Sequence, residues 1–138
     1  HVPRSRHAVP PGGHVRPHRH NDPAKCEAII VRQGSLGFVR FCDDGSPDPE
    51  QSFLADPRKD VIGFDVRAGV WHTFFALEPD TVVYEVKAGP YDAAADKGFA
   101  PWAPNEGSVE SHTYLAELED WFRNHFNLPP RSWTAQEG

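Results

Sequence analysis

The segments His18-Arg19-His20 and Gly69-Val70-Trp71-His72, with Glu27 between them in the chain, decide the fold that this sequence predicts. Side chains alternate between the two faces of a β-strand, so His18 and His20 project from the same face. Glu27 opens the next predicted strand, and His72 opens a later one directly after a glycine turn. Imidazoles and a carboxylate that meet from different strands are typical ligands of first-row divalent metals. We therefore predict a metal site, inside a small β-barrel, that is formed by His18, His20, Glu27 and His72.

The length and composition limit the class of protein. A chain of 138 residues can form one domain with a hydrophobic core. Its 11 glycines and 14 prolines indicate short strands joined by many turns, and the aromatic content of 12% argues against disorder. The chain contains no Met and begins at His1, so we expect an upstream segment to be missing from it.

The charge distribution and the cysteines indicate where the protein works and what it binds. A net charge of −6 predicts no nucleic-acid or membrane partner, because both are polyanionic. No apolar run is long enough to span a bilayer, and no signal peptide is visible. Cys26 and Cys42 do not form a disulfide framework, and Cys26 is expected to be a small buried hydrophobic residue. We therefore expect a cytoplasmic protein that acts on a small soluble molecule.

Short apolar runs between turn residues predict a series of β-strands. The predicted strands are residues 14–20, 27–31, 36–41, 61–66, 71–76 and 81–86, with a further short strand around 52–54. Gly34 has the spacing of a tight hairpin after the strand at 27–31, and Glu78-Pro79-Asp80 is expected to join the last two strands as a hairpin. Residues 1–13 and 89–107 are expected to be irregular.

The hydrophobic pattern changes from strand to helix near residue 108. Apolar residues recur there at three- and four-residue steps, which predicts an amphipathic helix that begins at Ser108 or Ser111 and ends at Pro129-Pro130. The residues in this pattern are Tyr114, Leu115, Leu118, Trp121, Phe122 and Phe126. We predict an all-β barrel over residues 1–107, followed by a helix and a proline-containing tail at 108–138. This C-terminal part is either a packing extension or a linker to another domain.

Several side chains near the predicted metal ligands are candidates for catalysis and substrate binding. Arg16 shares the strand face of His18, so its guanidinium either binds an anionic substrate group or forms a structural ion pair. Glu27 and Arg16 are the candidate catalytic residues. Tyr84 and Glu85 alternate on one strand, so only one of them can face the cavity. The candidate substrate-binding residues are Arg16, Phe74, Tyr84, Glu85 and Trp102.

The spacings Gly12-x5-His18-x-His20, Glu27-x6-Gly34 and Arg67-x-Gly69-x2-His72 resemble the two motifs of the cupin superfamily. Arg67 departs from that pattern, since cupins often have Pro there. The long gap between His20 and Glu27 resembles the WbuC-like branch of cupin metalloproteins. Further strings resemble the same branch, namely residues 16–20, 71–74, 85–91 and 96–104. The resemblance implies a double-stranded β-helix, or jelly-roll, fold with the same metal ligands.

The same resemblance implies several functions, of which one is favoured. Similar cupins form the zinc-binding half of hydrazine synthetases, beside a methionyl-tRNA-synthetase-like partner. This favours a redox-neutral zinc enzyme that rearranges an amino-acid-derived ester to form an N–N bond. The alternatives are a sugar-modifying enzyme of surface-polysaccharide biosynthesis, an Fe(II)-dependent oxygenase and a non-catalytic small-molecule-binding module. Zn²⁺ is the expected cofactor, with Fe²⁺ or another first-row divalent metal as the alternative. A homodimer stays open, because cupins commonly dimerise.

Overall fold

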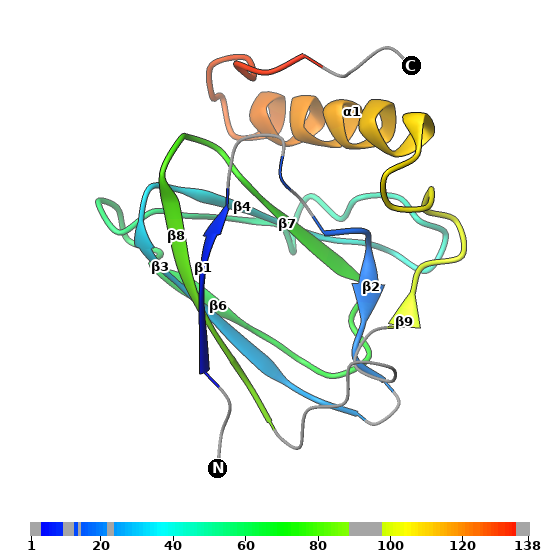
Figure 1. The fold of residues 1–138 in the computed structure, drawn as a ribbon, viewed down its shortest axis with the longest axis horizontal. Coiled ribbons are helices and arrows are strands. Elements are labelled where there is room, and N and C mark those ends of the chain that lie inside the picture. The colour runs from blue at the N-terminus through cyan, green and yellow to red at the C-terminus, as the bar shows by residue number, and fades with distance from the viewer. Residues whose placement is uncertain (1–3, 10–12, 14, 22–23, 89–97, 135–138) are drawn as a thin grey trace.

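The computed structural model describes residues 4–9, 13, 15–21, 24–88 and 98–134, which form two antiparallel sheets and one helix (Figure 1). The first sheet has the strand order β1-β8-β3-β6, and the second has the order β5-β4-β7-β2-β9. The strands of the first sheet are β1 (Arg4–Val9), β3 (Glu27–Gln33), β6 (Gly63–Val66) and β8 (Thr81–Lys87). The strands of the second are β2 (His18–Arg19), β4 (Leu36–Arg40), β5 (Phe53–Ala55), β7 (His72–Ala76) and β9 (Gly98–Phe99). Two facing sheets and one C-terminal helix confirm the predicted all-β fold.

One hydrophobic cluster fills the space between the two sheets. On β3 and β8 the inward residues come opposite one another in register, with Val31 paired to Val83. On the second sheet Phe38 is paired to Phe74, and both side chains are buried. The buried members of this inner cluster are Ile29, Val31, Leu36, Ala55, Phe74 and Val83. Alternation along each strand therefore fixes which side chains enter the interior.

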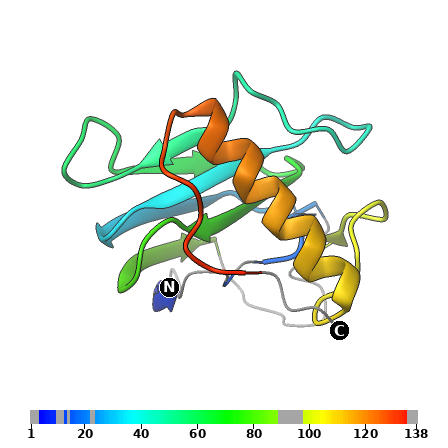
Figure 2. The same cartoon turned by 90° about the horizontal axis from the view of Figure 1, so that it is seen from above.

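A second cluster lies on the outer face of the second sheet, beneath helix α1 (Val109–His125). Figure 2 shows α1 lying across the strands of this sheet. Phe122 is fully buried there, and its ring lies 5.4 Å from the ring of Phe75. Ser108 is the N-cap, because its side chain accepts a hydrogen bond from the backbone N–H of Ser111. The helix ends before Pro129, as the sequence predicts.

Arg123 in α1 connects the helix both to the end of β7 and to the segment that follows the helix. Arg123 pairs with Glu119 one turn earlier in the helix, with 3.1 Å between nitrogen and oxygen. It also donates to the carbonyl oxygens of Leu77 and Pro129, at 2.6 and 2.9 Å. The described part of residues 108–138 therefore packs on the barrel.

Both predicted hairpins are wrong, because the strands that they were expected to join lie in different sheets. β3 and β8 belong to the first sheet, whereas β4 and β7 belong to the second. Gly34, at φ +79°, lies where the chain passes from β3 in the first sheet to β4 in the second. Next to it, the carbonyl oxygen of Ser35 accepts a hydrogen bond from the N–H of Leu77, which lies where the chain returns from β7 to β8. All five residues of β7 are buried, since one face meets the interior and the other meets α1. A strand buried on both faces belongs in the middle of a sheet, where β4 and β2 flank it.

Three further strand predictions need correction. The strand expected at 14–20 is reduced to β2, and Pro17 directly before it has no N–H to donate to a neighbour. β1 was expected to be irregular, yet it pairs with β8 as an edge strand of the first sheet. β9 lies within the segment 89–107 that was also expected to be irregular, of which residues 89–97 lie outside the described residues.

Candidate metal centre

The predicted metal ligands meet at one end of the space between the sheets. His18, His20, Glu27 and His72 are all buried, with 0 to 3% of each residue exposed. One potential ligand atom from each of the four lies within 4.8 Å of the others. The rings of His18 and His72 are the closest, with 4.5 Å between their centroids. This cluster could hold a metal ion, as the sequence predicts.

Strand pairing places these side chains. His18 on β2 is directly opposite His72 on β7, so both rings project from the same face of the second sheet. Glu27 opens β3 in the first sheet and reaches the rings from the other side. The turn before His72 is held by Gly69, at φ +80°, whose N–H donates to the carbonyl oxygen of His20 at 3.1 Å. Glycine is needed there because L side chains rarely adopt this backbone conformation.

Backbone carbonyl groups orient two of the imidazoles. Nδ1 of His18 lies 2.9 Å from the carbonyl oxygen of Arg16, and Nδ1 of His72 lies 2.8 Å from that of Val70. A carbonyl oxygen can only accept, so each Nδ1 carries the hydrogen and donates. This leaves Nε2 of each ring with the lone pair that a metal ligand needs.

The contact between His72 and Glu27 tests whether a cation fits. Nε2 of His72 lies 2.7 Å from Oε1 of Glu27, and Nε2 of His20 lies 3.5 Å from the same oxygen. A lone pair on Nε2 would repel a carboxylate oxygen at such a distance, so a proton or a metal ion must lie between them. One proton joins only one imidazole to Glu27, and a second proton would add another positive charge to the buried cluster, whereas a divalent cation would satisfy all the converging ligand atoms at once. The residues present therefore fit a first-row metal.

The carboxylate of Glu27 is held in its charged form. Burial alone would raise its pKa, but the polar contacts with His20, His72 and Glu85 outweigh burial and hold the pKa well below its usual range. Nζ of Lys87 lies 4.0 Å from Oε2 of Glu27 and adds positive charge on the same side. An ionised carboxylate at this depth is a strong ligand for a cation.

Glu85, not Tyr84, faces the interior. Glu85 is opposite Ile29 in the register of β8 and β3, and its carboxylate lies 3.2 Å from Nζ of Lys87. Tyr84 is 41% exposed on the outer face of the first sheet. Burial and the neighbouring Glu27 raise the pKa of Glu85 to about 7, against the lowering effect of Lys87. Lys87 was not predicted as a residue of this cluster, although the alternation that brings Glu85 inward also brings in the residue two positions later.

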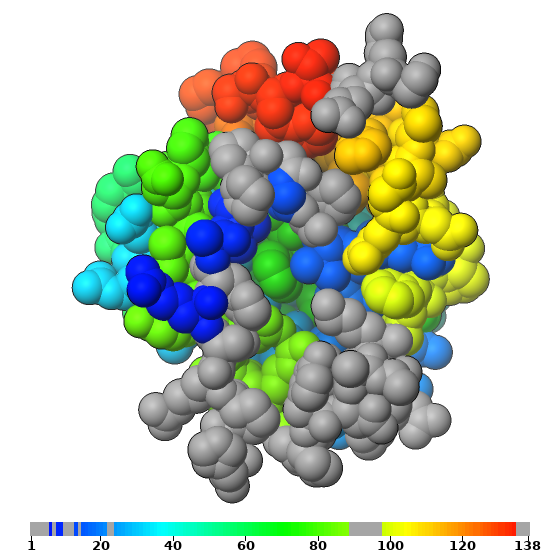
Figure 3. Space-filling view, in the orientation of Figure 1, coloured from blue at the N-terminus to red at the C-terminus, as the bar shows by residue number. Residues whose placement is uncertain are grey.

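Arg16 does not reach into the interior. Its guanidinium donates to the carbonyl oxygens of Ala100 and Ala103 and to Oδ1 of Asn105, at 2.9 to 3.0 Å. The segment after β9 thereby lies against β2, as the yellow and blue surfaces of Figure 3 show. Of the two roles considered, the contacts correspond to the structural one, with carbonyl and amide acceptors in place of a carboxylate.

The other predicted substrate-binding residues are divided between the two faces of the second sheet. Phe74 lies in the inner cluster, on the same face of β7 as His72. Trp102 instead packs on Phe41 and Trp71 beneath α1, with ring centroids 4.9 and 6.2 Å away. Trp71 directly precedes His72, the first residue of β7, and packs in the outer cluster while His72 faces the interior, so the sheet separates Trp102 from the metal ligands. Cys26 was expected to be buried, but both Cys26 and Cys42 are exposed free thiols.

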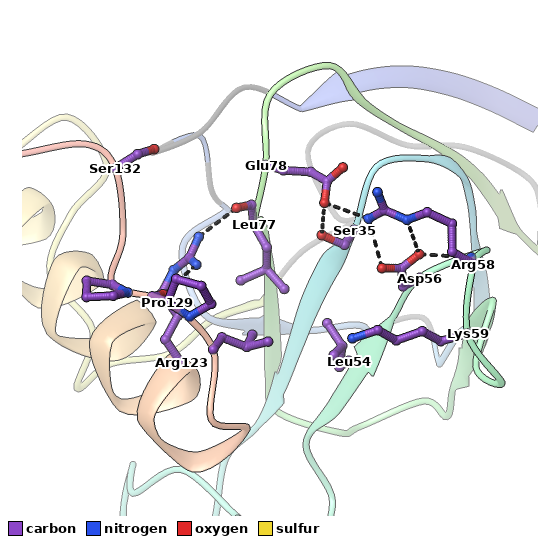
Figure 4. A pocket seen from close by; sticks show the side chains of 12 residues that line it. Ser35, Leu54, Asp56, Arg58, Lys59, Leu77, Glu78, Arg123, Pro129 and Ser132 are labelled. Atoms are coloured by element: carbon purple, nitrogen blue, oxygen red, sulfur yellow. Dashed lines mark hydrogen bonds and ion pairs between the residues drawn. The ribbon is translucent and has the colours of Figure 1, made fainter.

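Cavities open at two places among the described residues that bear on the site. One, of about 580 Å³, lies between the β7–β8 connection and the C-terminal segment, away from the metal ligands (Figure 4). Arg58 crosses its edge and pairs with Asp56 and Glu78. The other, of about 340 Å³, includes Phe38, whose ring stacks on that of His72. Within the described residues, no helix is long and apolar enough to cross a membrane.

Two sequence comparisons give little about function. Residues 2–52, which include three of the four predicted metal ligands, match a family model described as a domain of unknown function, DUF6016. No curated protein matches the chain.

Solved structures give the fold. The chain is similar to the Mycobacterium tuberculosis rmlC epimerase, with 20% identity and a TM-score of 0.55 over 70% of this chain and 50% of that one. It is similar to the capsular polysaccharide assembling protein CapF from Staphylococcus aureus, with 20% identity and a TM-score of 0.59 over 71% of this chain and 26% of that one. It is also similar to the QdtA 3,4-ketoisomerase from Thermoanaerobacterium thermosaccharolyticum, a double mutant in complex with TDP. That match has 17% identity and a TM-score of 0.53, over 71% of this chain and 64% of that one.

The chain covers less than two thirds of each of these proteins, and the low identities make the likeness one of fold. The comparisons do not support the N–N bond-forming reaction or the WbuC-like branch that the sequence resemblance favoured. The solved structures and the strand order together establish the fold of this chain. It has the RmlC-like cupin fold, a double-stranded β-helix, with a helix appended to its C-terminal side.

Proposed function

We propose that this chain is a metal-dependent, redox-neutral enzyme that modifies a sugar by isomerisation or epimerisation next to a carbonyl group. The observation that carries the proposal is the buried cluster of His18, His20, Glu27 and His72 in the interior of the fold. Proteins of the same fold include an epimerase, a sugar 3,4-ketoisomerase and a capsular polysaccharide assembling protein. The proposal thus takes up the sugar-modifying alternative from the sequence analysis.

The chemistry of these reactions matches the groups that the interior offers. Both reactions remove a proton from a carbon beside a carbonyl and return a proton, so no electron acceptor is consumed. When bound, a divalent metal would act as a Lewis acid and stabilise negative charge on the substrate oxygen. Glu85 presents a carboxyl group to the interior beside Glu27, and we assign it the transfer of the proton. Lys87, at 3.2 Å, supplies the positive charge that balances it.

The residues predicted to be catalytic take different places in this proposal. Glu27 would help to hold the metal, and its carboxylate is also hydrogen-bonded to Glu85. Arg16 positions the segment that carries Ala100, Ala103 and Asn105. No contact among the described residues favours N–N bond formation, so we do not carry that reaction further. Zinc and Fe(II) both suit this ligand set, and metal analysis separates them.

The proposal is tested by metal analysis combined with hydrogen exchange. Elemental mass spectrometry on protein purified without added metal should give about one zinc per chain. The same protein, incubated in D₂O with a TDP-linked 4-keto sugar, should place deuterium beside the carbonyl, as read by NMR. Glu85→Gln should remove the exchange and keep the metal, whereas His125→Ala, on the exposed helix, should change neither.

Other outcomes select the alternatives. Bound iron with oxygen consumption would replace the proposal by the oxygenase. A bound metal without exchange on any keto sugar tested would favour a non-catalytic binding module.

A further inference from the structure

The cavity of about 340 Å³ shares its wall with the metal cluster. The ring of Phe38 in this wall stacks on the ring of His72, with 5.8 Å between centroids and 25° between planes. Val66, also in the wall, is directly opposite Glu27 in the register of β6 and β3. The cavity is therefore separated from two of the four predicted ligands by a single layer of side chains.

Two arginines line this cavity, and neither guanidinium has a partner among the described residues. Arg40 lies on β4 directly opposite His72, and Arg67 follows Val66 at the end of β6. Neither guanidinium makes a hydrogen bond or an ion pair with any other group in the described part of the chain. The contrast with Arg16, Arg58 and Arg123 is clear, since each of those three guanidinium groups is bound by two or more acceptors.

Unpaired guanidinium groups in a cavity wall are suited to bind an anion. Arg40 is half-buried and loses hydration, whereas Arg67 is exposed at the rim of the cavity. An anion that accepts N–H groups in pairs restores the hydrogen bonds that Arg40 has lost and can also reach Arg67. Asp65 is the one carboxylate in the described lining, so the arginines outnumber the acids by one. Phe53, at 40% exposed, stacks with Phe38 and adds an aromatic surface beside the charges.

The segment that carries Arg67 also positions the metal ligands. The N–H of Val70 donates to the carbonyl oxygen of Arg67, and the carbonyl oxygen of Val70 in turn accepts from Nδ1 of His72. Gly69 in the same turn donates to the backbone of His20. Arg67 is also the position at which this sequence departs from the cupin motif that it resembles. Arg67 thus brings a positive charge to the turn that leads to His72.

We infer that Arg40 and Arg67 form a subsite that holds an anionic group of the substrate, a phosphate or a carboxylate, beside the metal centre. This inference deepens the proposed function, and it rests on that function in treating the bound anion as part of a substrate. A phosphorylated sugar held by the two arginines would have its charged end fixed next to His72 and Glu27. The binding of an anion to this cavity is a property that can be measured without turnover.

The test is calorimetric titration of the full chain, loaded with its metal, with inorganic pyrophosphate and in parallel with succinate. The variant R40Q/R67Q should bind the preferred anion at least about tenfold more weakly. Arg32→Gln is the matched control, because Arg32 is an exposed arginine on β3 that makes no hydrogen bond or ion pair through its guanidinium within the described residues. It should change the affinity by less than about twofold. Metal content, measured on every variant, confirms that the fold and the centre are intact.

The two anions distinguish the sources of charge. Tighter binding of pyrophosphate indicates a phosphorylated substrate, and tighter binding of succinate indicates a carboxylate. Equal losses in R40Q/R67Q and Arg32→Gln, or no binding of either anion, would overturn the subsite. Arginine-dependent binding in a protein without hydrogen exchange on keto sugars would keep the subsite and refute the proposed function, so the two failures are separate.

Discussion

Nε2 of His72 and Oε1 of Glu27 lie 2.7 Å apart, across the gap between two different sheets. One residue comes from β7 and the other from β3, and 45 positions separate them in the chain. The contact brings together two groups that both accept hydrogen bonds, because the hydrogen of His72 is on Nδ1, which already donates to the carbonyl oxygen of Val70. A cation between them is the simplest way to make this relationship favourable.

Replacing His72 by alanine should empty the metal site. The change removes one of the four predicted ligands and also one of the partners that hold Glu27 in its charged form. We expect metal content to fall to about a tenth of the wild-type value or lower, measured by elemental mass spectrometry. His125→Ala is the control, since that ring stacks on Trp121 on the exposed face of the helix. Full metal occupancy in His72→Ala would refute the ligand assignment.

Arg16→Ala should loosen the segment that follows β9 and leave the metal in place. The guanidinium is the shared donor for Ala100, Ala103 and Asn105, and it also lies over the ring of Phe99. We expect faster amide hydrogen exchange over residues 98–106, with unchanged exchange in α1. Unaltered exchange in that segment would show that the arginine contributes little to its order.

Asp56 makes stability depend on pH in the acid range. The hydrogen bond from Arg58 lowers the pKa of Asp56, although burial opposes the shift. A lowered folded-state pKa adds stability that is present above the unfolded value of 3.8 and is lost as pH falls through the folded value. Urea unfolding of the wild type should therefore show stability falling below about pH 4. Asp56→Asn should flatten that part of the profile, whereas Asp43→Asn on the surface should not; identical profiles for both variants would contradict the assignment.

Gly37→Ala should weaken the attachment of the helix. A Cβ at this position would lie 2.7 Å from the ring of Phe75 and 3.1 Å from the ring of Phe122, so one of these rings must move. We expect a loss of about 1–3 kcal/mol in the free energy of unfolding. Gly98→Ala is the control, because its Cβ would meet Arg19 only at an ordinary 3.6 Å. A loss of the same size in the control would show that the two rings are not the cause.

The metal cluster could be predicted from the sequence because its signals are local. Alternation alone places His18 and His20 on one face, and glycine before His72 marks the turn that presents it. The choice between Tyr84 and Glu85 could not be made, since it depends on the register of β8 against β3. That register puts Glu85 opposite the buried Ile29, and the information lies in two strands that are far apart in the chain.

The assignment of strands to the two sheets could not be predicted from the sequence. Turn residues at Gly34 and Asp80, both at positive φ, are typical of hairpins, and they were interpreted in that way. The same backbone conformations also let a chain cross from one sheet to another. Trp102 was misplaced for a related reason, because which face of a sheet a loop returns to is decided by packing with Phe41 and Trp71. Neither choice is encoded in a short window of sequence.

The complete burial of β7 limits how this protein can change over evolution. His72 and Phe74 face the interior, while Thr73 and Phe75 face the opposite side, and all five positions are buried. Thr73 donates its hydroxyl to the backbone of Val15, so even the polar residue is committed to one partner. In a library of all single substitutions, β7 should tolerate fewer replacements than any exposed strand edge, and the survivors should preserve volume. Variation between relatives is therefore expected to gather in the polar segments around this strand, which itself changes only together with the helix or the metal cluster that it separates.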